Sequence, residues 1–179
     1  MYIQEEAGTI VLFKENDLWF SKLEDGVYGE PERYSKNINF KYYHRHASLT
    51  KDGNTMVFTA EVLDKQLNRF HLDIFRTEKD AEGVWSKPVR LPTFINSPYN
   101  EDSPEISPDG KLLFFSSDRT DGVGGYDVYY VEMFRNDSVL HRLAAPINSP
   151  ADDIYFKMIE DSSVAFLSSN RLGGFGNMD

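Results

Sequence analysis

The sequence repeats itself at constant spacing, and this feature limits the choice of fold more than any other. At an offset of 57 residues, Thr50–Gly53 aligns with Ser107–Gly110. At an offset of 52 residues, Phe115–Arg119 aligns with Leu167–Arg171. An Ile-Asn pair recurs at both offsets, as Ile38-Asn39, Ile95-Asn96 and Ile147-Asn148. Matches that recur at fixed spacing indicate copies of one supersecondary unit, stacked beside one another.

Each copy is predicted to contain four short strands. In the third copy, Glu105–Ser107 precedes a turn at Asp109-Gly110, where glycine accepts a positive φ. Apolar and aromatic residues at 111–116 and at Tyr126–Val131 predict the next two strands, and a fourth is expected near 139–143. No segment keeps an apolar period of about 3.6 residues, so we expect very little helix. Four strands in about 50 residues are typical of a β-propeller blade.

The predicted fold class is therefore all-β, a partial β-propeller of about three and a half four-stranded blades in one segment of 179 residues. The repeats are placed at about 1–41, 42–99, 100–150 and 151–179. The fourth repeat is incomplete, because Asp179 aligns with Asp127, where the third strand of the preceding repeat begins. Such an arc leaves blade edges open, so we expect either a longer natural protein or self-association through those edges.

Composition excludes several functional classes. Acidic residues number 29 and basic residues 19, so the net charge is −10 and the chain repels nucleic-acid phosphates. Cysteine is absent, which excludes disulfides, thiolate zinc sites and cysteine nucleophiles. The longest apolar runs have about five residues where a membrane-spanning helix needs about 20, and the N-terminal residues lack a signal-peptide pattern. We expect no cofactor, because the glycine loops at 124–127 and 173–176 lack the lysine and the helix of a phosphate-binding loop.

The third repeat and the stretch that precedes it resemble a known family. DSPEISPDGKLLFFSSDRTDGVGGYDVYYV resembles the WD-like repeat of TolB-type β-propellers. GVWSKPVRLPTFINSPYNED is similar to the lead-in found in envelope proteins that carry this propeller beside an OmpA-type peptidoglycan-binding domain. The resemblance is looser in the second repeat, at Phe58–Glu61, and loosest at Glu6–Gly8. It implies a non-catalytic scaffold that is periplasmic or outer-membrane-associated and binds a protein partner in the bacterial cell envelope, where peptidoglycan-associated proteins are one class of partner.

The starts of the first strands form the candidate binding site, because in a propeller they lie at the rim of the central channel. His44-Arg45-His46 would place both imidazoles on one strand face, since strand side chains alternate. The aligned segments are Glu101–Ser103 and Asp152–Ile154. The candidate rim residues are therefore His44, Arg45, His46, Glu101, Asp102, Asp152 and Asp153. Three interpretations of these residues are open: a binding rim, a group of metal ligands or acid–base catalysts, or a structural group in which Arg45 pairs with carboxylates across blades. We expect no bound metal.

A second group recurs between repeats and is interpreted as structural. It comprises Asp109, Gly110, Asp118, Arg119, Gly125, Asp127 and Arg171. Asp118, Asp121 and Asp127 form an acidic, glycine-rich loop whose oxygens suit Ca²⁺, but the spacing is not that of an EF-hand. We expect Asp127 to accept backbone N–H bonds, or to pair with Arg119, where a strand begins.

Two enzyme classes remain as alternatives. Some TolB-like propellers are metal-dependent oligogalacturonate-type lyases, but a histidine metal site needs more histidines than His71 and His141 add. A prolyl-oligopeptidase-type enzyme also carries a propeller, for which this chain would be the accessory part, because it has no Gly-x-Ser-x-Gly motif. The serine pairs 116–117 and 168–169 have no plausible base. Aromatic residues offer a glycan or peptide platform or, more commonly, core packing: Trp19, Trp85, Tyr126, Tyr129 and Phe175.

Overall fold

The fold is a series of antiparallel β-sheets. The structure is a computed structural model that describes residues 3–6, 8–40, 43–133, 135, 138–159, 164–173 and 178, of which residues 3–6 are described by their backbone alone. Every strand pair in these ranges is antiparallel, and these ranges contain no helix. The all-β prediction is confirmed.

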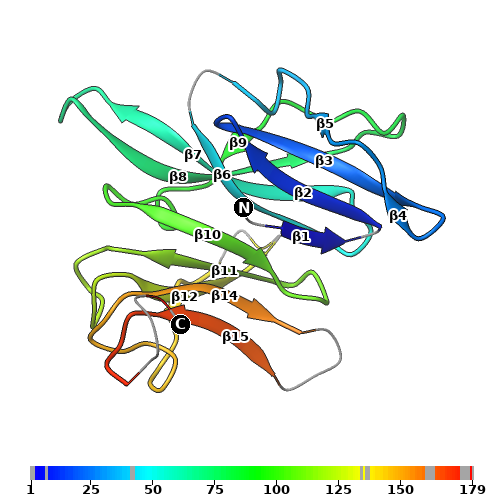
Figure 1. The fold of residues 1–179 in the computed structure, drawn as a ribbon. Helices are drawn as coiled ribbons and strands as arrows, with labels where there is room; N and C mark the ends of the chain where they lie inside the picture. Colours follow the sequence, from blue (N-terminus) through cyan, green and yellow to red (C-terminus); the bar gives the residue numbers. More distant parts are fainter. Residues whose placement is uncertain are drawn as a thin grey trace.

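Four sheets follow one another along the chain, and we call them blades 1 to 4 (Figure 1). Blade 1 contains β1 (Ile3–Glu6), β2 (Thr9–Lys14), β3 (Asp17–Glu24), β4 (Val27–Tyr28) and β5 (Glu32–Arg33). Blade 2 contains β6 (His44–Leu49), β7 (Thr55–Asp64), β8 (Arg69–Glu78) and β9 (Val89–Arg90). Blade 3 contains β10 (Glu101–Ile106), β11 (Leu112–Ser117), β12 (Asp127–Glu132) and β13 (His141–Arg142). Blade 4 contains β14 (Asp153–Met158) and β15 (Ala165–Ser169).

The strand starts follow the sequence offsets. The first strands of blades 2, 3 and 4 begin at His44, Glu101 and Asp153, which are 57 and 52 residues apart. Asp153 is therefore the counterpart of Glu101, and Asp152 is the counterpart of Asn100. The alignment that placed Asp152 opposite Glu101 is wrong by one residue.

The blades meet through their first strands. β6 lies against both β1 and β10, and β10 lies against β14. The colours of Figure 1 follow this order from the blue blade 1, through blades 2 and 3, to the orange and red blade 4. Among the described strands, none of blade 1 contacts β14 or β15. The described sheets thus form an open arc, with the first strands on its inner side.

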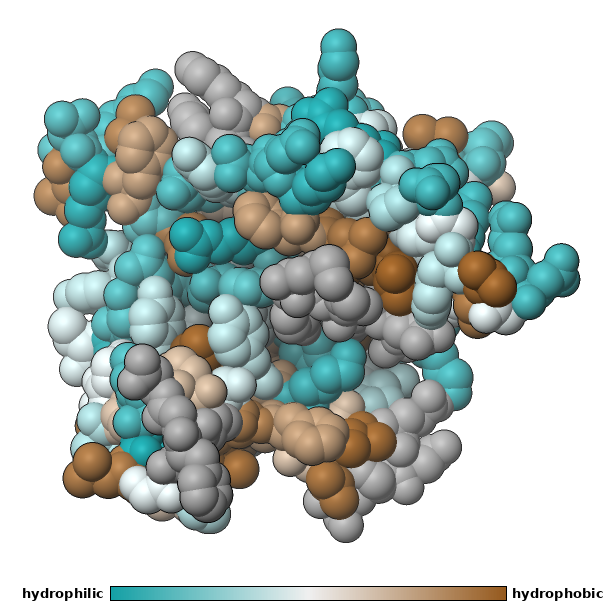
Figure 2. Space-filling view, in the orientation of Figure 1, coloured by the Kyte–Doolittle hydropathy of each residue, from teal (hydrophilic) through white to brown (hydrophobic). Residues whose placement is uncertain are grey.

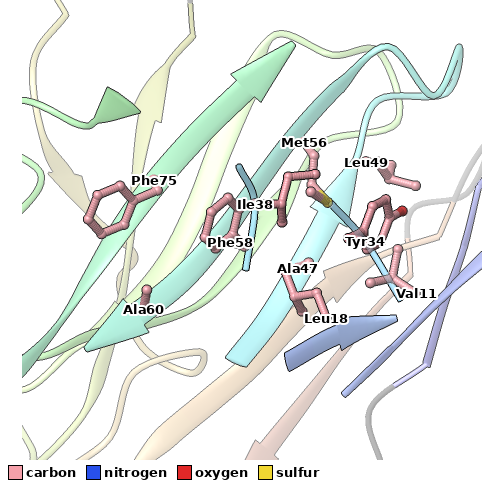
Figure 3. Close-up of a cluster of buried hydrophobic side chains, with 10 residues drawn as sticks. All are labelled: Val11, Leu18, Tyr34, Ile38, Ala47, Leu49, Met56, Phe58, Ala60 and Phe75. Atoms are coloured by element: carbon pink, nitrogen blue, oxygen red, sulfur yellow. The ribbon is translucent and has the colours of Figure 1, made fainter. Parts of the chain in front are cut away.

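Apolar side chains fill the space between successive blades. The cluster between blades 1 and 2 draws on β2, β3, β6, β7 and β8, and on Tyr34 and Ile38 before β6 (Figure 3). Strand alternation divides the blade 2 side chains between two interfaces, because Phe58 packs toward blade 1 whereas Val57 packs toward blade 3. Figure 2 shows hydrophobic side chains reaching the surface in two bands, one in the upper and one in the lower half of the molecule.

One repeated asparagine closes each of the first three blades. The amide of Asn96 accepts the N–H of Ile74 at 2.8 Å and donates to the carbonyls of Ile74 and Leu91 at 2.9 and 3.0 Å. Asn39 and Asn148 make the same three bonds in blades 1 and 3. The side chain therefore takes the place of a neighbouring strand where the ladder ends, and satisfies buried backbone groups.

Candidate functional site

The inner strands of blades 2, 3 and 4 share an irregularity at one equivalent position. The ladder of β6 shifts between Arg45 and Ala47, and the ladders of β10 and β14 shift at the corresponding places. The irregular stretch contains His46 in β6, Ser103 and Pro104 in β10, and Tyr155 and Phe156 in β14; His46, Ser103 and Tyr155 occupy the equivalent position. Ser103 and Tyr155 have φ values of 51° and 56°, in the left-handed region that bulky residues seldom adopt. Bulges and strained residues of this kind concentrate at functional sites and re-aim side chains.

The bulge in β6 separates the two histidines. His44 is fully buried and its ring lies 4.7 Å from that of Phe40, edge to face. Because the bulge adds a residue, Arg45 and His46 both reach the inner cavity instead. The prediction that His44 and His46 share one face is therefore wrong, since it assumed uninterrupted alternation.

The cavity that Arg45 and His46 reach has a volume of about 770 Å³, and we call it the channel-mouth pocket. Its other walls come from β2, β3, the segments before β5 and β6, and β14. The walls include Leu12, Lys14, Trp19, Glu30, Pro31, Tyr43, Arg45, His46 and Tyr155. The β2–β3 turn brings blade 1 to this place, because the N–H of His44 donates to the carbonyl of Asn16 at 3.1 Å. Three blades thus contribute to one pocket at the start of β6.

Asp102 joins blades 2 and 3 beside this pocket. Its Oδ1 lies 2.8 Å from His46 Nδ1, and its Oδ2 lies 3.9 Å from Arg45 Nη1. Burial acts to raise the pKa of Asp102, but the hydrogen bond with His46 and the charges of His46 and Arg45 lower it overall. The Tyr155 ring of blade 4 stands edge to face against His46, with ring centres 4.9 Å apart. The structure therefore brings Arg45, His46 and Asp102 together, and Arg45 pairs across blades.

Glu101 and Asp153 face the interior of their own blades. Glu101 is fully buried and accepts bonds from Ser97, Ser117 and Arg119, with Arg119 Nη2 at 3.1 Å from Oε1. Arg171 Nη2 makes the same contact with Asp153 Oδ1 in blade 4, at 2.5 Å. Burial raises the pKa of Glu101, although these hydrogen bonds and the charge of Arg119 oppose the shift. The placement of Glu101 and Asp153 at the rim is therefore wrong, and His44 occupies the same internal position in blade 2.

The remaining acidic residues of the repeats bind backbone groups. Asp152 accepts the N–H of Tyr126 at 3.0 Å and so ties blade 4 to blade 3. Asp127 accepts the N–H groups of Val123 and Gly124 at 2.6 and 3.1 Å, which is the kind of contact that the sequence predicts for it. A Cβ at Gly125 would overlap the Asp152 carboxylate.

The turn and loop carboxylates are held in the same way. Asp118 accepts the backbone N–H and the side-chain amide of Asn100, both at 2.7 Å. Asp109 accepts the hydroxyl of Ser107 at 2.7 Å, and bonds from Ser107 and Lys111 lower its pKa to about 2. Gly110 follows with a φ of 73°, which the Pro-Asp-Gly turn requires.

The described ranges contain neither a cluster of metal ligands nor a membrane-spanning helix. No group of three or more histidine or acidic side chains is arranged there to hold a metal ion. Asp121 accepts the Tyr129 hydroxyl at 3.0 Å, so the three carboxylates of the acidic loop all bond to protein groups. In the same ranges, no helix is long and apolar enough to cross a membrane.

The aromatic candidates separate into different roles. Tyr129 is only 2 % exposed and stacks on Phe115 in the core between blades 2 and 3. Trp85 packs at the edge of the blade 1–2 core beneath the Lys79 ammonium, whereas Trp19 forms a wall of the channel-mouth pocket. Tyr126 binds Asp152 through its backbone, and Phe175 lies outside the described residues.

Sequence reasoning missed a buried polar cluster in blade 2. Asp73 is fully buried, its Oδ2 lies 2.5 Å from Arg90 Nε, and His71 Nε2 lies 3.5 Å from its Oδ1. Burial raises the pKa of Asp73 although Arg90 and His71 oppose the shift. The alternation of His71 and Asp73 along one strand was the only signal, and nothing in the sequence pairs them with Arg90.

Comparisons with known proteins give the fold. No family model matches the chain, and no curated protein matches it. TolB from Acinetobacter baumannii is similar in structure, with a TM-score of 0.60 and 17 % identity over 94 % of this chain. A putative TolB from Agrobacterium tumefaciens has a TM-score of 0.55 and 19 % identity over 97 % of this chain. Hydrazine synthase from Kuenenia stuttgartiensis has a TM-score of 0.52 and 12 % identity over 92 %.

These similarities establish a TolB-like β-propeller fold, as the sequence predicts. The chain spans 36 % of the Acinetobacter protein, 67 % of the Agrobacterium protein and 48 % of the hydrazine synthase chain. The chain therefore corresponds to part of each of those proteins.

Proposed function

We propose that this chain is a non-catalytic propeller scaffold that binds a partner protein in the bacterial cell envelope, and that the channel-mouth pocket is the binding site. One observation carries the proposal. Three successive inner strands bulge at the same position, and two of the bulge residues, His46 and Tyr155, lie at the pocket. A left-handed Tyr155 costs about 1–3 kcal/mol, and backbone strain of this size clusters at binding and catalytic sites.

The contacts of the other polar residues support binding rather than catalysis. The repeated carboxylates are engaged by arginines and backbone N–H groups inside the blades. The histidines that a lyase would gather around a metal are dispersed: His44 is buried in blade 2, His71 sits beside Asp73, and His141 stacks on Tyr130. The lyase is therefore the weaker alternative. The second alternative, an accessory propeller of a peptidase, would use the same binding pocket and would differ only in its partner protein.

The proposed location in the cell envelope rests on similarity to other proteins. Two of the similar structures are TolB proteins, and the lead-in to the third repeat resembles that of propellers joined to OmpA-type domains. That resemblance supports a partner in the periplasm or at the outer membrane, and peptidoglycan-associated proteins are one class of such partners.

Site-specific photo-cross-linking in the native bacterium tests the proposal. A benzophenone amino acid replaces Tyr43, which is 48 % exposed at the pocket, or, as a control, Val89, which is 68 % exposed on β9. We expect an envelope-fraction protein to be linked at Tyr43 and not at Val89. Equal labelling at both positions, or a chain that fractionates with the cytosol, would contradict the proposal.

A further inference from the structure

We propose that the channel-mouth pocket recognises a carboxylate that lies beside an apolar side chain on the partner segment, and that Arg45 is the residue that pairs with it. The inference rests on the proposed function, because it names the chemistry that the same pocket selects. Three features of the pocket support this inference: the sign of its charge, the geometry of Arg45, and the apolar walls around Arg45.

The charge of the pocket is opposite to that of the chain. The chain as a whole has 29 acidic and 19 basic residues, whereas the described residues that line the pocket include Lys14 and Arg45 and one carboxylate, that of Glu30. Two further carboxylates lie nearby. Asp102 is bonded to His46, and Glu15 is 3.8 Å from Lys14 with its side chain 73 % exposed, where solvent screens it. An anionic group is therefore better matched to this pocket than to the surrounding surface.

Arg45 lines the pocket and keeps its hydrogen-bond donors available for a ligand. Its side chain is 46 % exposed, and its ion pair with Asp102 is 3.9 Å long, beyond hydrogen-bonding distance. The other Asp102 oxygen is bonded to His46, so this carboxylate steers the guanidinium by charge alone. In the described part of the chain, the Arg45 guanidinium makes no hydrogen bond. Its planar group of N–H donors can therefore bind both oxygens of a carboxylate at once.

The walls beside Arg45 are apolar. The indole N–H of Trp19 is already donated to the carbonyl of Lys14 at 3.1 Å, and the Lys14 ammonium lies 4.9 Å from the centre of its ring, so Trp19 adds aromatic surface beside a cation to the pocket wall. Tyr43 and Tyr155 add two more rings, and Leu12 and Pro31 add aliphatic surface. A cavity of about 770 Å³ is of the size that holds a small ligand or a few side chains. The occupant that fits is an extended peptide with an acidic residue next to an aromatic or aliphatic one.

Two capped tripeptides test this chemistry by calorimetric titration against the 179-residue chain. Acetyl-Phe-Asp-Phe-amide carries the carboxylate, and acetyl-Phe-Asn-Phe-amide has the same shape without the charge. We expect the acidic peptide to bind about tenfold more tightly, as for one charge-assisted hydrogen-bonded pair. Arg45→Gln should bring the ratio of the two affinities close to one. Lys111→Gln, which removes an equal charge from an exposed turn between β10 and β11, should leave the ratio unchanged.

The outcomes separate the two proposals. Equal affinity for both peptides, a ratio that persists in Arg45→Gln, or no binding of either peptide would overturn the carboxylate inference. If cross-linking at Tyr43 still captured an envelope protein, the proposed function would stand without it. If the acidic peptide bound through Arg45 but Tyr43 captured nothing, the proposed function would fail while the chemistry of the pocket remained.

Discussion

Replacing Arg119 with methionine should destabilise the protein more than almost any other single change. The guanidinium donates to Glu101 Oε1 at 3.1 Å, to the Ile95 carbonyl at 2.6 Å and to Ser117 Oγ at 3.1 Å, and its side chain is only 9 % exposed. It also lies 4.8 Å from the centre of the Tyr129 ring. The substitution keeps much of the volume but leaves the Glu101 carboxylate buried without its counter-charge.

The magnitude follows from burial. Removing one partner of a buried ion pair costs about 3–5 kcal/mol, because the remaining charge has lost its compensation. Arg171 makes the same set of bonds in blade 4, but its side chain is 36 % exposed and water screens the pair. Arg171→Met should therefore cost only about 1–2 kcal/mol. The two variants are a matched comparison in which solvent exposure is the main difference.

Blade 2 provides the compensating set of residues. His44, Ala60 and Val62 occupy the positions 57 residues before Glu101, Ser117 and Arg119. The triple replacement Glu101→His/Ser117→Ala/Arg119→Val copies that set into blade 3. It should recover at least half of the loss of Arg119→Met, because the set holds no ion pair and leaves no carboxylate buried without its counter-charge.

Urea denaturation followed by circular dichroism at two pH values is the assay. Burial raises the folded-state pKa of Glu101 above its unfolded value, so the stability this group contributes is present at low pH and is lost as pH rises through the folded pKa. Losing Arg119 raises that pKa further. The deficit of Arg119→Met should therefore be smaller at about pH 5 than at about pH 8. Equal losses for Arg119→Met and Arg171→Met, or a deficit that does not change with pH, would refute the reasoning.

Three further changes give measurable outcomes. Burial lowers the pKa of His44 in the folded state. The stability that this residue contributes is therefore present above its unfolded pKa of about 6.5 and is lost as pH falls toward the folded pKa. His44→Gln should flatten the acid side of a curve of unfolding free energy against pH, measured by urea denaturation. Asn96→Ala leaves buried backbone groups of blade 2 unpaired and should cost about 2–4 kcal/mol in the same assay, whereas Asn54→Ala in an exposed turn should cost less than about 0.5 kcal/mol. Asp127→Ala should cost about 1–3 kcal/mol, with a melting temperature that calcium does not change in either protein; a calcium-dependent melting temperature that vanishes in the variant would contradict this role.

Local signals in the sequence predicted most of the fold. Pro-Asp-Gly chemistry marks a turn wherever it occurs, so the turn at Asp109-Gly110 and the strands on either side were predictable. The repeats then placed β6 and β10 at equivalent positions and β14 to within one residue. What the sequence could not supply was the role of Asn96, whose three partners lie 5 and 22 residues away and are brought to it only by folding.

The site was predicted less completely, and the reason is the bulge. Alternation along an unbroken strand puts His44 and His46 on one face, but an extra residue after Arg45 turns His44 into the core and His46 toward the cavity. Tyr155 adopts a left-handed backbone conformation, which a sequence usually indicates by glycine or asparagine and here does not. Bulges depend on how neighbouring strands pair, so a single strand's sequence does not reveal them.

The most direct test of the account is a chemical-shift map of acetyl-Phe-Asp-Phe-amide on the nitrogen-labelled chain. The central claim is that three blades form one binding site at the mouth of the channel. We therefore expect the largest shifts at the Trp19 indole in blade 1, at Arg45 in blade 2 and at Tyr155 in blade 4. Shifts confined to outer strands such as β9 and β13, or to one blade alone, would contradict the claim.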